Sequence, residues 1–94
     1  MNKMWYCIDY QYDKKGRGLL YCGPDEDLAQ KLYVTLSIAL PKRDLQLREL
    51  QSNCDFYGRS MILPFSKMRD MLPDFRWDML IEQEQIFLQA VMTN

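Results

Sequence analysis

The feature that most constrains the fold is a short polar turn between two strand-like runs near the start of the chain. Residues Met4–Tyr12 are rich in aromatic and strand-compatible side chains, and Leu19–Cys22 are of the same kind. The segment between them, Asp13-Lys14-Lys15-Gly16-Arg17-Gly18, has the composition of a turn. The pattern predicts a β-hairpin, which is the first part of an antiparallel sheet.

The turn also predicts which side chains share a face of the hairpin. If Tyr12 pairs with Leu19, then Tyr10 lies opposite Tyr21. One face then carries Ile8, Tyr10, Tyr12, Leu19 and Tyr21, and the other carries Trp5, Cys7, Asp9, Gln11, Leu20 and Cys22. Cys7 and Cys22 would be near neighbours across the hairpin, where a packing role is favoured over a redox or ligand role.

A helix from Pro24 to about Leu40 is predicted after the hairpin. Proline fits the first turn, and the following carboxylates, Asp25, Glu26 and Asp27, suit the positive end of the helix dipole. Pro41 ends the helix. One broad apolar face, typical of a helix laid on a sheet, contains Leu28, Ala29, Leu32, Tyr33, Leu36, Ala39 and Leu40.

The second half of the chain predicts two more strands and two more helices. Asp44–Gln51 fits either a strand or a helix and is interpreted as a strand, and Asp55–Leu63 is a further strand. Ser66 can cap a short helix through Leu72, and Asp74 a longer one reaching about Met92. The expected fold is α+β, in the order β-β-α-β-β-α-α. We expect residues 1–94 to form a single domain, an antiparallel sheet with helices on one face.

The predicted terminal helix has two apolar sides. Its main face carries Trp77, Leu80, Ile81, Phe87, Leu88, Val91 and Met92, and a second, narrower stripe carries Phe75, Met79, Ile86 and Ala90. A small domain usually covers one such face, so we expect a partner surface or a second copy to cover the other. Glu84 projects from the main face and is either paired with an arginine (Arg48, Arg59 or Arg69) or placed at a binding surface.

Composition argues against an enzyme. The chain has 94 residues and no histidine, and its 12 Lys+Arg against 13 Asp+Glu give a net charge of −1. Catalytic triads and imidazole metal ligands are therefore absent, and the scattered cysteines lack the spacing of a zinc site. We expect no catalytic residues, no metal and no cofactor.

The sequence also indicates where the protein works. No apolar segment with a cleavage site opens the chain, and the longest uncharged runs, Leu32–Pro41 and Gln85–Asn94, are about half the length of a membrane-spanning helix. Three cysteines without a CxxC pair suit a reducing compartment. We expect a cytoplasmic protein without a membrane partner.

Charge is segregated along the chain, and this favours an interaction role. Lys14, Lys15 and Arg17 form a basic hairpin tip, whereas Trp77–Asn94 contain carboxylates and neither lysine nor arginine. We therefore expect a non-enzymatic module, an inhibitor, adaptor or regulator that covers a surface of a larger protein. Small accessory proteins of phages and mobile elements often have this profile.

The alternative is a small RNA- or DNA-binding module that uses the tyrosines and the basic tip of the hairpin. Nucleic acid is the less favoured partner, because the overall balance of charge is acidic.

Overall fold

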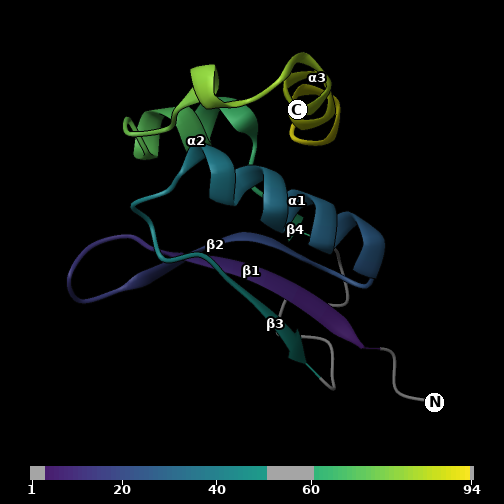
Figure 1. The fold of residues 1–94 in the computed structure, drawn as a ribbon. Coiled ribbons are helices and arrows are strands. Elements are labelled where there is room, and N and C mark those ends of the chain that lie inside the picture. Colours follow the sequence, from purple (N-terminus) through teal and green to yellow (C-terminus); the bar gives the residue numbers. More distant parts are fainter. Residues whose placement is uncertain (1–3, 51–60, 94) are drawn as a thin grey trace.

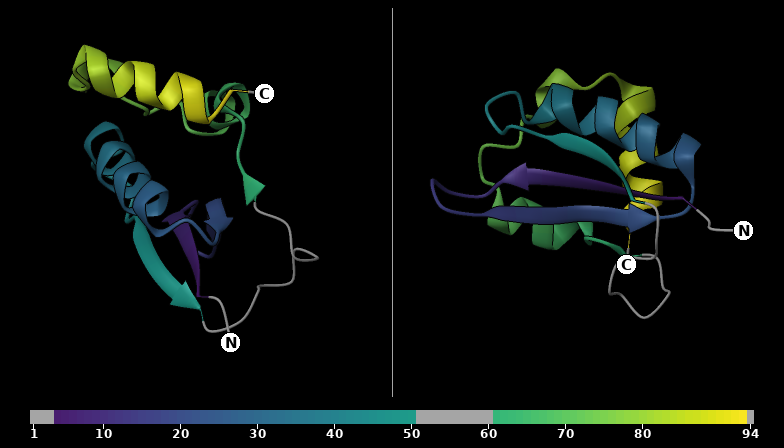
Figure 2. Two further views of the ribbon diagram at one scale, coloured as in Figure 1. Left: turned by 90° about the vertical axis from the view of Figure 1, so that its right-hand side faces the viewer. Right: turned by 90° about the horizontal axis from the view of Figure 1, so that it is seen from below.

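The computed structural model describes residues 4–50 and 61–93. Four antiparallel strands form one sheet in the order β3-β1-β2-β4, and the helices lie on one face of it, with α1 next to the sheet and α3 beyond α1 (Figures 1 and 2). The elements are β1 (Trp5–Gln11), β2 (Arg17–Gly23), α1 (Glu26–Ala39), β3 (Gln46–Leu50), β4 (Met61–Ile62), α2 (Phe65–Met71), the 3₁₀ turn η1 (Trp77–Met79) and α3 (Glu82–Val91). This arrangement confirms the predicted α+β class.

The hairpin turn forms where the sequence predicts it. The Asp13 carboxylate accepts hydrogen bonds from the backbone N–H groups of Lys15 and Gly16, at 2.8 and 2.9 Å. A short aspartate side chain can bond to the backbone two or three residues ahead, and this bonding specifies the turn.

The predicted register of the hairpin, with Tyr10 opposite Tyr21, is wrong along the whole of β1. Cys7 lies opposite Cys22 and Ile8 opposite Tyr21, but the register then shifts and places Tyr10 opposite Gly18. The shift is a β-bulge at Leu20, which turns Leu20 into the core beside Tyr21. Leu19 consequently packs on the other face of the sheet, with the cluster of Trp5, Cys7 and Cys22.

Helix α1 starts and ends close to the predicted bounds. The Asp25 side chain accepts a hydrogen bond from the N–H of Leu28 at 3.0 Å, so Asp25 is the N-cap. The predicted apolar face is buried at Ala29, Leu32, Leu36, Ala39 and Leu40, and it is half-buried at Leu28 and Tyr33.

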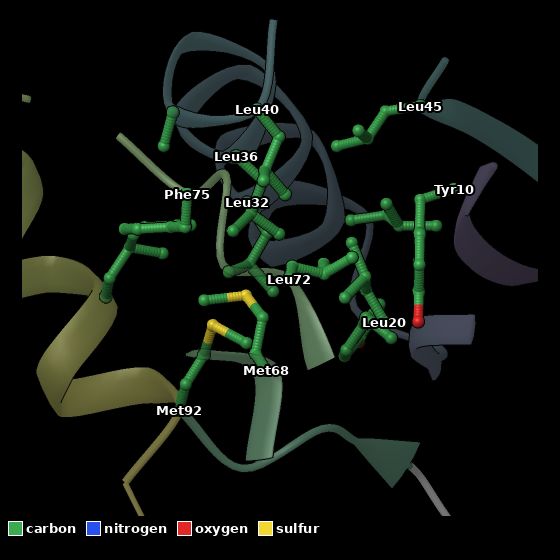
Figure 3. Close-up of a cluster of buried hydrophobic side chains, with 14 of the residues drawn as sticks. Tyr10, Leu20, Leu32, Leu36, Leu40, Leu45, Met68, Leu72, Phe75 and Met92 are labelled. Atoms are coloured by element: carbon green, nitrogen blue, oxygen red, sulfur yellow. The ribbon is translucent and has the colours of Figure 1, made fainter. Parts of the chain in front are cut away.

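One hydrophobic core joins the sheet to all three helices. Leu32 and Leu36 of α1 and its C-cap Leu40 meet Met68 of α2, Leu72, Phe75 and Met92 in the centre of the cluster (Figure 3). The carbonyl of Met92 accepts a hydrogen bond from the N–H of Phe65 at 2.8 Å, which ties the end of α3 to the start of α2. This hydrogen bond therefore fixes the position of α2 relative to the end of α3.

The strand after α1 is confirmed, and the last predicted strand is described only in part. Gln46–Leu50 pairs with β1. Met61 and Ile62 pair with β2, and residues 55–60 of the predicted strand lie outside the described residues. Helix α2 starts after Pro64 rather than at a Ser66 cap.

The single long terminal helix that the sequence predicts is wrong. The chain instead makes the turn η1, an extended step at Leu80 and Ile81, and then α3. Long-range contacts explain the break. Phe75 packs into the core with its ring centroid 5.9 Å from that of Phe65, and the N–H of Arg76 donates to the carbonyl of Ala39 at 2.7 Å. These contacts offset the helical bonds that would otherwise form there.

Asp74, predicted to cap that helix, instead binds Arg43. The Arg43 guanidinium donates to both carboxylate oxygens of Asp74 at 2.8–3.2 Å and to the backbone carbonyls of Gln11 and Tyr12 at 3.1 and 2.7 Å. One side chain thus joins the end of β1, the loop after α1 and the segment before η1. Bidentate arginine–carboxylate pairs are among the stronger polar contacts in proteins.

Acid should weaken this contact. Hydrogen bonds from Arg43 lower the pKa of the Asp74 carboxyl below its ordinary value of 3.8, against the opposing effect of partial burial. Because the pKa in the folded protein lies below that of the unfolded chain, the stabilisation is present above about pH 4 and is lost as pH falls through the folded pKa. We expect the free energy of unfolding of Asp74→Asn, measured in urea between pH 7 and pH 2.5, to fall less steeply with acid than that of the wild type. Parallel curves would contradict this role of Asp74.

No helix among the described residues is long and apolar enough to cross a membrane.

Candidate functional site

The predicted second stripe is divided by the break between η1 and α3. Phe75 is buried, with 7% of its surface exposed, so it belongs to the core and not to a binding surface. Met79 is on η1, and Ile86 and Ala90 are on α3, all three exposed. Ile86 and Ala90 are four residues apart on the helix and so are neighbours on its surface.

Exposed apolar side chains are concentrated around the start of α3. The large hydrophobic residues exposed among the described residues number six, and three of them, Met79, Ile81 and Ile86, lie within eight residues of sequence. Their exposed fractions are 52%, 62% and 58%. We call the exposed side chains of Met79, Ile81, Glu82, Ile86 and Ala90 the α3 surface.

The opposite side of α3 is anchored in the core. Leu88 is fully buried and Met92 is 1% exposed, while the ammonium group of Lys31 lies 4.5 Å from the centre of the Phe87 ring. Helix α3 therefore covers α1 with the side that bears Leu88, whereas Glu82, Ile86 and Ala90 of the same helix are exposed.

Ile81 is the residue that the sequence reasoning missed, because it was assigned to the buried face of a continuous helix. In the structure Ile81 is the N-cap of α3, with an extended backbone at φ −73° and ψ 164°. Serine, threonine, aspartate and asparagine are preferred at an N-cap, since their side chains bond to the exposed N–H groups of the first turn. Isoleucine cannot do this, so a large apolar residue stands where helix stability favours a polar one.

Glu84 compensates in part for the missing cap. Its carboxylate accepts a hydrogen bond from the N–H of Ile81 at 3.0 Å, which is one half of a capping box. Neither reading of Glu84 from the sequence included this role. The half-buried Glu84 side chain is held at the helix end.

Asp78 and Arg76 form an exposed ion pair beside Met79. Their charged atoms are 3.1 Å apart, and their side chains are 68% and 55% exposed. Hydrogen bonds from Arg76 lower the pKa of the Asp78 carboxyl. A pair this exposed contributes little to stability, so both groups can be rearranged when a partner binds.

The basic hairpin tip is smaller than the sequence predicts. Lys14 and Lys15 are exposed at the turn, but Arg17 is bound to Asp9 at 2.8 Å and to Asp44 at 3.3 Å. Arg48 binds the other carboxylate oxygen of Asp9 at 3.1 Å. Arg17 is therefore part of a network across β2, β1 and β3, and only the two lysines project from the tip.

The tyrosines of the hairpin do not form an exposed platform. Tyr10 and Tyr21 are 1% and 3% exposed and belong to the core under α1. Tyr6 donates its hydroxyl hydrogen to Glu26 at 3.0 Å. Tyr12 is exposed at 48%, so the hairpin offers one accessible ring from the three tyrosines expected on that face.

A pair of cysteines and a surface hollow lie elsewhere in the described part of the chain. The Cys7 and Cys22 sulfur atoms are 2.7 Å apart in a buried cluster with Trp5, which confirms that these residues are neighbours. A surface hollow of about 300 Å³ is lined by Tyr21, Pro24, Asp25, Leu28, Met61, Ile62 and Val91, and its carboxylate is the Asp25 cap. Within residues 4–50 and 61–93 no three His, Cys, Asp or Glu side chains are grouped to hold a metal ion.

No protein-family model, curated protein or solved structure is detectably similar to this chain.

Proposed function

We propose that the protein is a non-enzymatic protein–protein interaction module of the cytoplasm, an inhibitor, adaptor or regulator that binds a larger protein through the α3 surface. The observation that carries the proposal is the exposed isoleucine at the N-cap of α3. Positions where a sequence departs from the locally favoured residue tend to serve function rather than folding.

The surroundings of Ile81 support this proposal. Met79 and Ile86 add two more large apolar side chains, each more than half exposed. Glu82 and Gln89 are exposed and polar along the same helix. An apolar centre with a polar rim is the usual composition of a protein interface.

The nucleic-acid alternative has less support from the fold. It needs accessible aromatic rings for stacking beside a basic strip. Tyr10 and Tyr21 are buried, and Arg17 is engaged by two carboxylates, so Tyr12, Lys14 and Lys15 are what the hairpin would offer to a nucleic acid.

The absence of histidine and of a nucleophile–base pair at workable spacing in the sequence supports a role without catalysis.

The sharpest test separates folding from binding at one position. Ile81→Ser would complete a capping box with Glu84, because the serine hydroxyl can bond to the N–H of residue 84. We expect the free energy of unfolding to rise by about 0.5–1 kcal/mol. Binding to the partner in host cells, measured by cross-linking and mass spectrometry, should nevertheless weaken.

Val34→Ser is the matched control. Val34 is 57% exposed on α1, so the substitution removes a similar amount of exposed apolar surface from another helix. We expect its cross-linked products to match those of the wild type. Unchanged products for Ile81→Ser would show that the α3 surface is not the binding site.

A further inference from the structure

We propose that the partner segment covering the α3 surface is both apolar and cationic, with lysine or arginine side chains beside its apolar residues. This inference rests on the proposed function and adds the chemistry of the partner. It comes from the charges that surround the exposed apolar residues.

The segment from η1 to the end of α3 carries one sign of charge. Residues 77–93 include Asp78, Glu82 and Glu84 and no lysine or arginine. Residues 18–30 also lack lysine and arginine, and their carboxylates, Asp25, Glu26 and Asp27, lie at the start of α1. An apolar surface whose unpaired charge is a carboxylate attracts a partner of opposite charge and disfavours an acidic one.

Glu82 is the carboxylate best placed to meet such a partner. It is exposed, forms no ion pair with the described residues, and lies four residues before Ile86 on α3. Residues with this spacing are adjacent on a helix surface. A lysine or arginine reaching Glu82 would therefore come from a segment that also covers Ile86.

Helix stability explains only part of this charge pattern. Glu82 and Glu84 are in the first turn of α3, where the helix dipole favours carboxylates. The same dipole favours cations in the last turn, yet that turn has no basic residue. The last turn of α1 has no basic residue either, so the proposal rests on the exposed Glu82 beside the exposed Ile86.

The cations near this segment are already engaged. Arg76 is bound to Asp78, and Lys31 lies over the Phe87 ring on the side of α3 that faces α1. Neither group neutralises Glu82. The net charge presented with Met79, Ile81 and Ile86 is therefore negative.

Two matched peptides provide the probe. Each is an amphipathic helix of about 14 residues with a leucine face, and the polar face carries lysines in one and glutamates in the other. Fluorescence anisotropy measures the binding of each peptide to the intact protein. We expect the lysine peptide to bind at least about tenfold more tightly at low salt, with the difference shrinking as salt screens the charges.

Two variants locate the binding. Ile86→Ser should lower the affinity for the lysine peptide several fold. Glu82→Lys should reduce the preference for the lysine peptide over the glutamate peptide, while the melting temperature of the protein stays within a few degrees of that of the wild type. Asp70→Lys, an exposed carboxylate of α2, is the charge-matched control and should leave the preference unchanged.

The outcomes separate this inference from the proposed function. Equal binding of both peptides, with both weakened by Ile86→Ser, would overturn the cationic partner and leave the α3 surface as a binding site. Peptide binding that is unchanged by Ile86→Ser would overturn both the cationic partner and the α3 surface as the binding site. Sedimentation equilibrium tests whether a second copy of the chain covers the α3 surface. A dimer that dissociates on Ile86→Ser would show that it does, and the inference of a cationic partner would be wrong.

Discussion

Replacing Leu88 by alanine should lower the free energy of unfolding by about 3–4 kcal/mol, as expected for a fully buried leucine. Leu88 is 0% exposed and belongs to the core cluster that joins α3 to α1, α2 and the sheet. A domain of this size has a total stability of about 5–10 kcal/mol. The variant should therefore melt roughly 15–25 °C below the wild type in calorimetry.

Ile86→Ala on the same helix is the matched comparison. Ile86 is 58% exposed, so its truncation leaves no cavity, and we expect a change within about 0.5 kcal/mol. Equal losses for the two variants would mean that both sides of α3 are packed, and the α3 surface would then not be open for binding.

Gly18→Ala should be destabilising by about 2–3 kcal/mol, because the added methyl group would overlap the buried side chain of Tyr10. A Cβ atom at Gly18 would lie 2.6 Å from each of three Tyr10 atoms, the ring carbons Cε1 and Cζ and the hydroxyl oxygen. Tyr10 is 1% exposed and belongs to the core cluster, so a shift of its ring would disturb buried neighbours. This clash exceeds the gain of about 0.4–1 kcal/mol that alanine gives by restricting the unfolded chain.

Gly16→Ala tests the same substitution in the same hairpin without the clash. Its Cβ would be 3.7 Å from the nearest atom, Oδ1 of Asp13, which is ordinary contact. We expect its urea midpoint to equal or slightly exceed that of the wild type. A loss as large as that of Gly18→Ala would show that the hairpin resists any alanine, and the explanation from Tyr10 would be wrong.

The parts of the fold that the sequence predicted correctly are specified by local signals. The turn depends on Asp13 and the two residues that bond to it, and α1 depends on the Asp25 cap and on Pro41. Each of these determinants acts within a few residues. The apolar face of α1 then fixed the side on which the sheet packs.

The errors arose where tertiary packing decides the local structure. The bulge at Leu20 accompanies the packing of Tyr10 against Gly18, and the break before α3 accompanies the burial of Phe75 against Phe65. The helical periodicity of residues 74–92 does not indicate that Phe75 packs against Phe65. Propensity is a weak guide when tertiary packing opposes it.

The candidate site was predicted in part for the same reason. Met79, Ile86 and Ala90 are exposed, and their place on one side of a helix was visible in the sequence, apart from the break that separates Met79. Phe75 was wrongly included and Ile81 was missed, because both depend on where the helix starts. An isoleucine three residues before Glu84 was the available signal, since that position of a capping box normally carries serine or threonine.

The tie between α2 and the end of α3 has a consequence for synthesis on the ribosome. The hairpin, α1 and β3 emerge first, but the core cluster around α1 is complete only when Met68, Leu72, Phe75 and Met92 follow. Until then the nascent chain displays an apolar helix face, the kind of surface that chaperones bind and that promotes aggregation. Slow translation of the second half of the message should therefore lower the yield of soluble protein more than slow translation of the first half.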